Sequence, residues 1–127
     1  MNYDRFATAI NCMDGRTQLP VINYVLSKYR VDFVDMITEP GPVRVLAEDR
    51  DKPALEAIKR SVEISTEKHG SSHIAIVAHH DCAGNPVEKE TQFRQILESI
   101  RTVQSWVPKV EIIGLWIDEK WTVREVI

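Results

Sequence analysis

The run Ile74-Ala75-Ile76-Val77-Ala78 limits what this chain can fold into more than any other feature. Its five residues are all apolar, and polar residues stand on both sides of it. A strand with this pattern has no polar face to offer to water, so helices must cover both of its faces. The run therefore predicts a central strand, 73–78, in an α/β domain.

Strands and helices alternate along the rest of the chain. Short apolar runs predict strands at 6–11, 31–37 and 110–117, and 121–126 is expected to return as an antiparallel edge strand after a turn at 118–120. Apolar residues at helical spacing predict helices that begin near Thr17, near Pro53 and near Val87. The prolines and glycine of 39–42 predict a loop. We expect the inward helix faces to hold Ile22, Val25, Leu26, Tyr29, Leu55, Ile58, Val62, Phe93, Ile96, Leu97, Ile100 and Val103.

This alternation predicts the architecture. Consecutive strands joined by helices pair in parallel through right-handed crossovers. We therefore predict a three-layer sandwich, with a central sheet of four mostly parallel strands plus one antiparallel edge strand. The chain has 127 residues, without repeats or linker-like stretches, which predicts a single domain over 1–127. A domain of this length folds without a structural metal, so any metal would serve chemistry.

Charge and hydropathy exclude some classes of partner. The net charge is −3, and Lys and Arg are interspersed with Asp and Glu along the chain, so we expect no nucleic-acid partner. No apolar stretch approaches the roughly 20 residues that a membrane span needs. We see no secretion signal in the first residues and expect a cytoplasmic protein. In such a protein, cysteines near His and Asp favour metal binding or catalysis over a disulfide.

Cys12, His79 and Cys82 are the predicted metal ligands. Cys12 follows the first predicted strand and His79 follows the third, and in a common doubly wound order these two strands are neighbours. Ligands bind outside the carboxyl ends of such strands. His79 and Cys82 are separated by two residues, so one turn can bring both to one ion. Two thiolates and an imidazole are a donor set that zinc prefers.

Asp14 and Arg16 alternate just beyond Cys12 and form the predicted catalytic pair. An ionised Asp14 would accept a hydrogen bond from zinc-bound water, while Arg16 would hold the carboxylate through a charge-assisted fork. Three alternatives stay open: Asp14 occupies the fourth zinc position, the two residues form only a local ion pair, or they cap the following helix.

Two segments resemble those of a known family. Cys12-Met13-Asp14-Gly15-Arg16 resembles the Cys-x-Asp-x-Arg segment of the β-class carbonic anhydrases, and 79–84 resembles their His-x-x-Cys segment followed by small residues. The resemblance implies zinc held by Cys12, His79 and Cys82, with Asp14 and Arg16 as the adjacent pair. It implies reversible hydration of CO2 to bicarbonate by zinc-bound hydroxide. A homodimer or higher homo-oligomer with a small-molecule substrate is also expected.

The chain departs from this family at one loop and at its beginning. Larger members carry Arg-Asn-Ala-Gly-Asn after the second strand, where this chain has Thr38-Glu39-Pro40-Gly41-Pro42, and it lacks their N-terminal helical arm. Three alternatives therefore stay open. They are a zinc hydrolase of carbonyl sulfide or carbon disulfide, a non-catalytic zinc-binding protein, and a thiol redox protein that forms a Cys12–Cys82 disulfide. We expect Trp106, Trp116 and Trp121 to lie in the core or in an interface.

Overall fold

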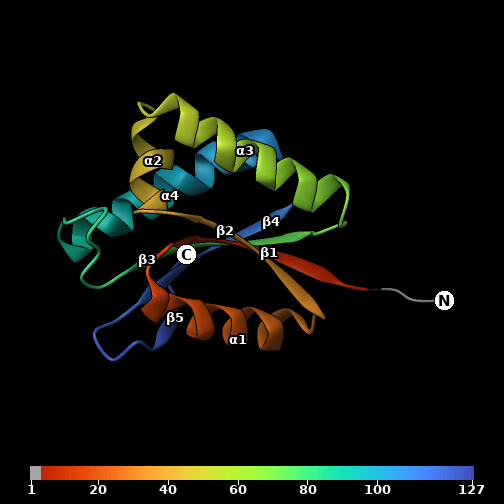
Figure 1. The fold of residues 1–127 in the computed structure, drawn as a ribbon, viewed down its shortest axis with the longest axis horizontal. Coiled ribbons are helices and arrows are strands. Elements are labelled where there is room, and N and C mark those ends of the chain that lie inside the picture. The colour runs from red at the N-terminus through yellow and green to blue at the C-terminus, as the bar shows by residue number, and fades with distance from the viewer. Residues whose placement is uncertain (1–3) are drawn as a thin grey trace.

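A five-stranded sheet forms the middle layer of the computed structural model, which describes residues 4–127 (Figure 1). The strands are β1 (Phe6–Cys12), β2 (Phe33–Glu39), β3 (His73–His79), β4 (Glu111–Ile117) and β5 (Val123–Glu125). They lie in the order β2-β1-β3-β4-β5. The first four are parallel, and β5 pairs with β4 in the antiparallel sense. The predicted sheet is confirmed.

Helices form the two outer layers. One face of the sheet is covered by α1 (Gln18–Tyr29), and the other is covered by α2 (Pro42–Glu48), α3 (Lys52–Glu67) and α4 (Lys89–Trp106) (Figure 1). A short 3-10 helix, η1 (Gly15–Thr17), joins β1 to α1. The three-layer arrangement that the alternating pattern predicts is therefore confirmed.

The apolar core is divided in two by the sheet. Successive side chains of a strand point to opposite faces, so Ile74 and Ile76 pack toward α2, α3 and α4, while Ala75 and Val77 pack toward α1. These four residues are fully buried. Any polar side chain among them would lose its contact with water, which explains why this run is apolar throughout.

The helix α2 was not predicted. The segment Glu39-Pro40-Gly41-Pro42 reads as a loop because proline and glycine interrupt regular structure, yet Pro42 opens α2. Proline is compatible with the first turn of a helix, where its missing N–H would have no partner. Gly41 precedes the helix with φ +56, a left-handed conformation that glycine adopts without strain. The short segment 39–42 therefore both ends β2 and begins α2.

Three smaller predictions were wrong. The strand β2 begins and ends two residues later than predicted. Leu97, predicted to face inward on α4, is 39% exposed, because Ile96 and Val103 take the buried stripe. On α1 the fully buried residues are Val21 and Val25, and Ile22 is only half-buried.

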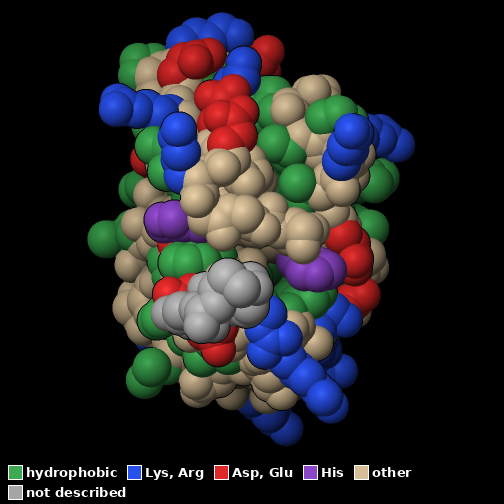
Figure 2. All heavy atoms as spheres, turned by 90° about the vertical axis from the view of Figure 1, so that its right-hand side faces the viewer, with side chains coloured by type: hydrophobic (Ala, Val, Ile, Leu, Met, Phe, Trp, Pro, Cys, Tyr) green, Lys and Arg blue, Asp and Glu red, His purple; other side chains and the backbone are tan. Residues whose placement is uncertain are grey.

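Charged side chains of both signs lie on the surface. Figure 2 views the molecule from the side on which its N-terminus lies, and shows Lys and Arg as well as Asp and Glu on this face, with uncharged atoms between them. This agrees with the interspersed charges of the sequence. Among the helices of residues 4–127, none has the length and apolar character needed to cross a bilayer.

Gly114 of β4 packs closely against Ile96 of α4, and this contact is testable. A Cβ added at Gly114 would lie 2.5 Å from Cγ2 of Ile96. We expect Gly114→Ala to lower the free energy of unfolding by about 1–3 kcal/mol, because overpacking forces neighbouring atoms out of place. Urea denaturation followed by circular dichroism measures the change.

Gly15→Ala is the matched control, since nothing lies within 4 Å of a Cβ built there. Its free energy of unfolding should not fall. In an Ile96→Ala background the contacting methyl is gone, so Gly114→Ala should cost much less than in the parent protein. An equal loss in both backgrounds would contradict the proposed clash.

Candidate metal centre

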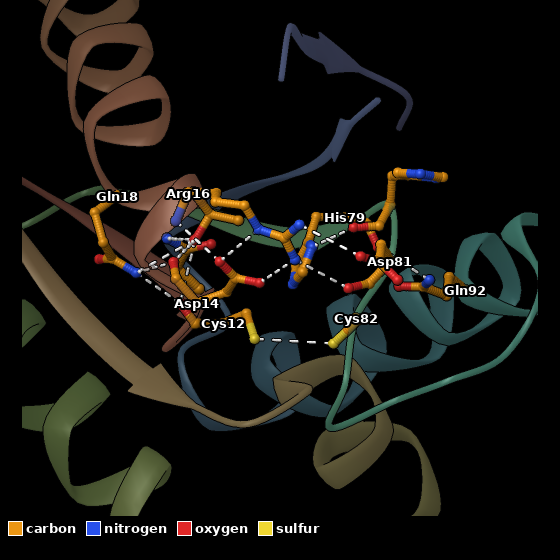
Figure 3. Close-up of polar contacts among 11 residues, drawn as sticks. Cys12, Asp14, Arg16, Gln18, His79, Asp81, Cys82 and Gln92 are labelled. Atoms are coloured by element: carbon orange, nitrogen blue, oxygen red, sulfur yellow. Dashed lines mark hydrogen bonds and ion pairs between the residues drawn. The ribbon is translucent and has the colours of Figure 1, made fainter. Parts of the chain in front are cut away.

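Two strand ends and one turn bring Cys12, His79 and Cys82 together. Cys12 ends β1 and His79 ends β3, and because these strands are parallel neighbours both residues lie at the same edge of the sheet. After β3, the backbone of Asp81 takes φ +60, which turns the chain so that Cys82 faces back toward Cys12. Figure 3 shows the three side chains pointing into one small volume.

The ligand atoms of the three residues lie within 4.8 Å of one another, and the two sulfurs are 3.8 Å apart. All three residues are buried, with exposed fractions between 1% and 5%. Two zinc–sulfur bonds of about 2.3 Å at a tetrahedral angle place their sulfurs about 3.8 Å apart. The observed sulfur separation therefore matches that of two thiolates on one zinc ion.

The imidazole of His79 is oriented by the backbone. Its Nδ1 lies 2.7 Å from the carbonyl oxygen of His80, and since a carbonyl can only accept, Nδ1 donates. The other nitrogen, Nε2, then carries a lone pair, and it is buried without a hydrogen-bond partner among residues 4–127. A buried polar atom without a partner is costly. A metal ion beside the sulfurs would give this lone pair its partner.

The two thiols also need a cation if both are to ionise. A hydrogen bond from Cys82 lowers the pKa of the Cys12 thiol, although burial opposes this. The same contact, together with burial, raises the pKa of Cys82 well above its ordinary value. One sulfur is thus stabilised as a thiolate at the expense of the other. A bound divalent cation removes that conflict, because it stabilises both thiolates.

Asp14 and Arg16 form an ion pair next to these ligands. The guanidinium donates from Nε to Asp14 Oδ1 at 3.1 Å and from Nη2 to Asp14 Oδ2 at 2.7 Å. The backbone N–H of Arg16 also donates to Oδ1, which makes Asp14 the cap of η1. The hydrogen bond from Arg16 lowers the pKa of Asp14 to about 2, so this carboxyl is ionised at neutral pH.

The same arginine joins the two turns at the site. Its Nη1 donates to Asp81 Oδ2 at 3.3 Å, and its Nη2 donates to the Asp81 carbonyl at 3.2 Å (Figure 3). Within residues 4–127 the group of converging ligand atoms does not include Asp14, whose oxygens face Arg16 instead. The pairing and the cap are thus both present, and the alternative of Asp14 as a fourth ligand has no support in this structure.

Sequence reasoning missed several residues of the site. Gln18 donates to the carbonyl oxygens of Cys12 and Asp14, at 2.8 and 3.0 Å, and fixes the turn between them. Gln92 donates to the carbonyl of His79 at 3.1 Å. Trp121, assigned to core or interface, lies over the Arg16 guanidinium, 4.3 Å from Cζ to the ring centroid. The sequence signal that could have found Trp121 is its position just after β4, because this strand ends at the same edge of the sheet as Cys12 and His79.

Solved structures to which this fold is similar include β-carbonic anhydrases. The chain is similar to β-carbonic anhydrase isoform I from the protozoan Trichomonas vaginalis, with a TM-score of 0.61 at 20% identity, covering 94% of this chain and 81% of that chain. It is also similar to a tetrameric β-carbonic anhydrase from the filamentous ascomycete Sordaria macrospora, with a TM-score of 0.58 at 13% identity, covering 97% and 81%. These identities show the fold alone.

Sequence comparison gives the family. No curated protein matches the chain significantly. A family model described as "Putative carbonic anhydrase" matches residues 2–127. The resemblance read from the segments around Cys12 and His79 is thereby confirmed, and the chain belongs to this carbonic anhydrase family.

Proposed function

We propose that this protein is a zinc-dependent lyase of the carbonic anhydrase type, which converts CO2 and water reversibly to bicarbonate. The observation that carries the proposal is the buried group of Cys12, His79 and Cys82, whose converging atoms include a nitrogen without a partner. Membership of the carbonic anhydrase family supports the reaction, and the donor set supports zinc.

Cys12, His79 and Cys82 would hold the ion. A zinc ion bound in this way supplies Lewis acidity, which makes a water molecule nucleophilic near neutral pH. The carbonyl oxygen of His80 holds the His79 ring in the tautomer that leaves Nε2 free to bind metal. Gln92 holds the backbone of His79 by donating to its carbonyl oxygen. These contacts let the chain present its ligands before the metal arrives.

Asp14 and Arg16 would orient the reacting hydroxyl group. An ionised carboxylate accepts hydrogen bonds but cannot donate them, so Asp14 selects a hydroxyl that points its proton toward it. Arg16 takes part in two bonds to this carboxylate and so limits its rotation. It also keeps Asp14 ionised, since the hydrogen bond from Arg16 lowers the pKa of Asp14. The pair would thus serve as a fixed hydrogen-bond acceptor beside the metal ligands.

A thiol redox protein is the second candidate function, favoured by two free thiols whose sulfurs lie 3.8 Å apart. A disulfide between Cys12 and Cys82 would leave Nε2 of His79 without a partner, whereas a metal ion would not. We therefore prefer the metal. Hydrolysis of carbonyl sulfide or carbon disulfide, and zinc binding without catalysis, remain alternatives that the assays below separate.

We further propose that the protein acts as a homodimer or higher homo-oligomer on a small-molecule substrate. The similar enzymes from Sordaria macrospora are described as tetrameric. Met13, which follows Cys12, and Leu19 in the first turn of α1 are 59% and 70% exposed, so apolar side chains beside the site are available to contact a second copy. The cytoplasmic location stays a prediction.

The purified protein should contain one zinc ion per chain, measured by inductively coupled plasma mass spectrometry. Cys82→Ser should lose it, because a serine hydroxyl does not ionise to replace the thiolate. Arg16→Ala is the control and should keep its zinc, since Arg16 contacts Asp14 and Asp81 rather than the ligand atoms. Wild-type protein that takes up no zinc, with a Cys12–Cys82 disulfide under oxidant, would support the redox candidate instead.

Stopped-flow measurement should detect CO2 hydration well above the buffer rate. Asp14→Asn keeps the shape of the side chain but removes its charge, and hydrogen bonds to charged groups contribute about 1.5–3 kcal/mol. We expect this variant to bind zinc normally and to lose about 10- to 100-fold in kcat. Full zinc without hydration would support the non-catalytic alternative, and sulfide release from carbonyl sulfide without CO2 hydration would support the hydrolase.

A further inference from the structure

Arg16 is exposed to water for much of its surface, so its orientation needs explaining. Its side chain is 47% exposed, and one partner, Asp81, is 70% exposed. Ion pairs with this much exposure are held weakly, since water competes for both charges. The two hydrogen bonds to Asp14 hold the guanidinium only through its N–H groups. A further contact is therefore needed to restrain the orientation of Arg16.

Trp121 supplies that contact. The Arg16 Cζ atom lies 4.3 Å from the centroid of the Trp121 ring, within the range in which an aromatic face attracts a cation. The indole is half-buried and packs against the apolar cluster on the α1 side of the sheet, which restrains the ring itself. The same ring lies 6.1 Å from the His79 ring, measured between centroids. Arg16 is therefore held through its N–H groups by a carboxylate and also by the face of an indole ring.

The turn that carries Trp121 is built to keep an unfavourable backbone conformation. Trp121 has φ +60, a left-handed conformation that a bulky side chain rarely adopts. Asp118, only 6% exposed, accepts hydrogen bonds through Oδ1 from the backbone N–H groups of Lys120 and Thr122, at 2.9 and 3.0 Å. Its Oδ2 accepts one from Arg124 Nε at 3.1 Å. Strain of this kind persists only where the surroundings fix it.

Glycine or asparagine would fit this backbone with less strain. The tryptophan therefore adds something that the turn alone does not need, namely an aromatic face that contacts the Arg16 guanidinium. We propose that Trp121 is a positioning residue, which acts through Arg16 to fix the orientation of the Asp14 carboxylate. Its effect on turnover rests on the proposed function, whereas its effect on Arg16 does not.

The first experiment follows Arg16 directly, in the full chain as purified. The Nε–H resonance of Arg16, assigned by its loss in Arg16→Lys, is recorded by nuclear magnetic resonance. Trp121→Gly removes the ring and relieves the backbone strain, so the variant should fold. We expect the resonance to move, because the ring current is gone, and its exchange with water to become about tenfold faster. Trp121→Phe should keep much of the exchange protection.

Lys120→Gly is the matched control, because it removes an exposed side chain from the same turn and keeps the N–H that bonds Asp118. Its Arg16 resonance and exchange rate should equal those of the parent protein. An unchanged exchange rate in Trp121→Gly would overturn the proposal, as would an equal change in Lys120→Gly.

The second experiment measures turnover. With zinc content unchanged, Trp121→Gly should lower kcat about tenfold, and Trp121→Phe should recover part of the loss. If Trp121 acts through Arg16, adding Trp121→Gly to Arg16→Ala should lower kcat no further. Additive losses would overturn the proposal. If the parent protein hydrates no CO2, the proposed function fails, and the exchange measurement alone decides the role of Trp121.

Discussion

The parallel pairing of β1 with β3 is the constraint on which the rest of the structure depends. Thr8, Ala9 and Ile10 pair with Ile74, Ala75 and Ile76. A slip of one residue would turn every side chain of one strand to the opposite face of the sheet. It would exchange isoleucines for alanines in both halves of the core, and it would point Cys12 away from His79. Core packing and ligand placement are therefore specified by the same register.

Much of this arrangement is readable from the residues. The unbroken apolar run of β3 predicts a strand covered on both faces, and the alternation around it predicts a parallel sheet. A parallel sheet gathers the carboxyl ends of its strands at one edge, so the sequence alone places Cys12, His79 and Cys82 together. This placement was possible because the fold fixes where each strand ends, and a side chain at a strand end can point in only a few directions.

The features that the sequence did not predict depend on local backbone geometry and packing, which residue type alone does not determine. Pro42 can end one element or open another, and only the left-handed backbone at Gly41 decides between them. Leu97 satisfies a helical apolar spacing, yet which stripe is buried depends on the angle at which α4 lies on the sheet. Trp121 is predicted to lie in the core or in an interface, and its contact with Arg16 was missed because it occurs with a backbone conformation that tryptophan rarely adopts.

The separation of the ligands along the chain has a consequence for the order in which the protein matures. The segment 13–78 lies between Cys12 and His79, so closing this long loop costs entropy that is repaid only when β1 docks beside β3. His79 and Cys82 lie on one turn, but without Cys12 they offer only two donors. Under the proposed function, an ion held by all three residues would bind firmly only after β1 has docked beside β3, and any opening that parts these two strands would release it.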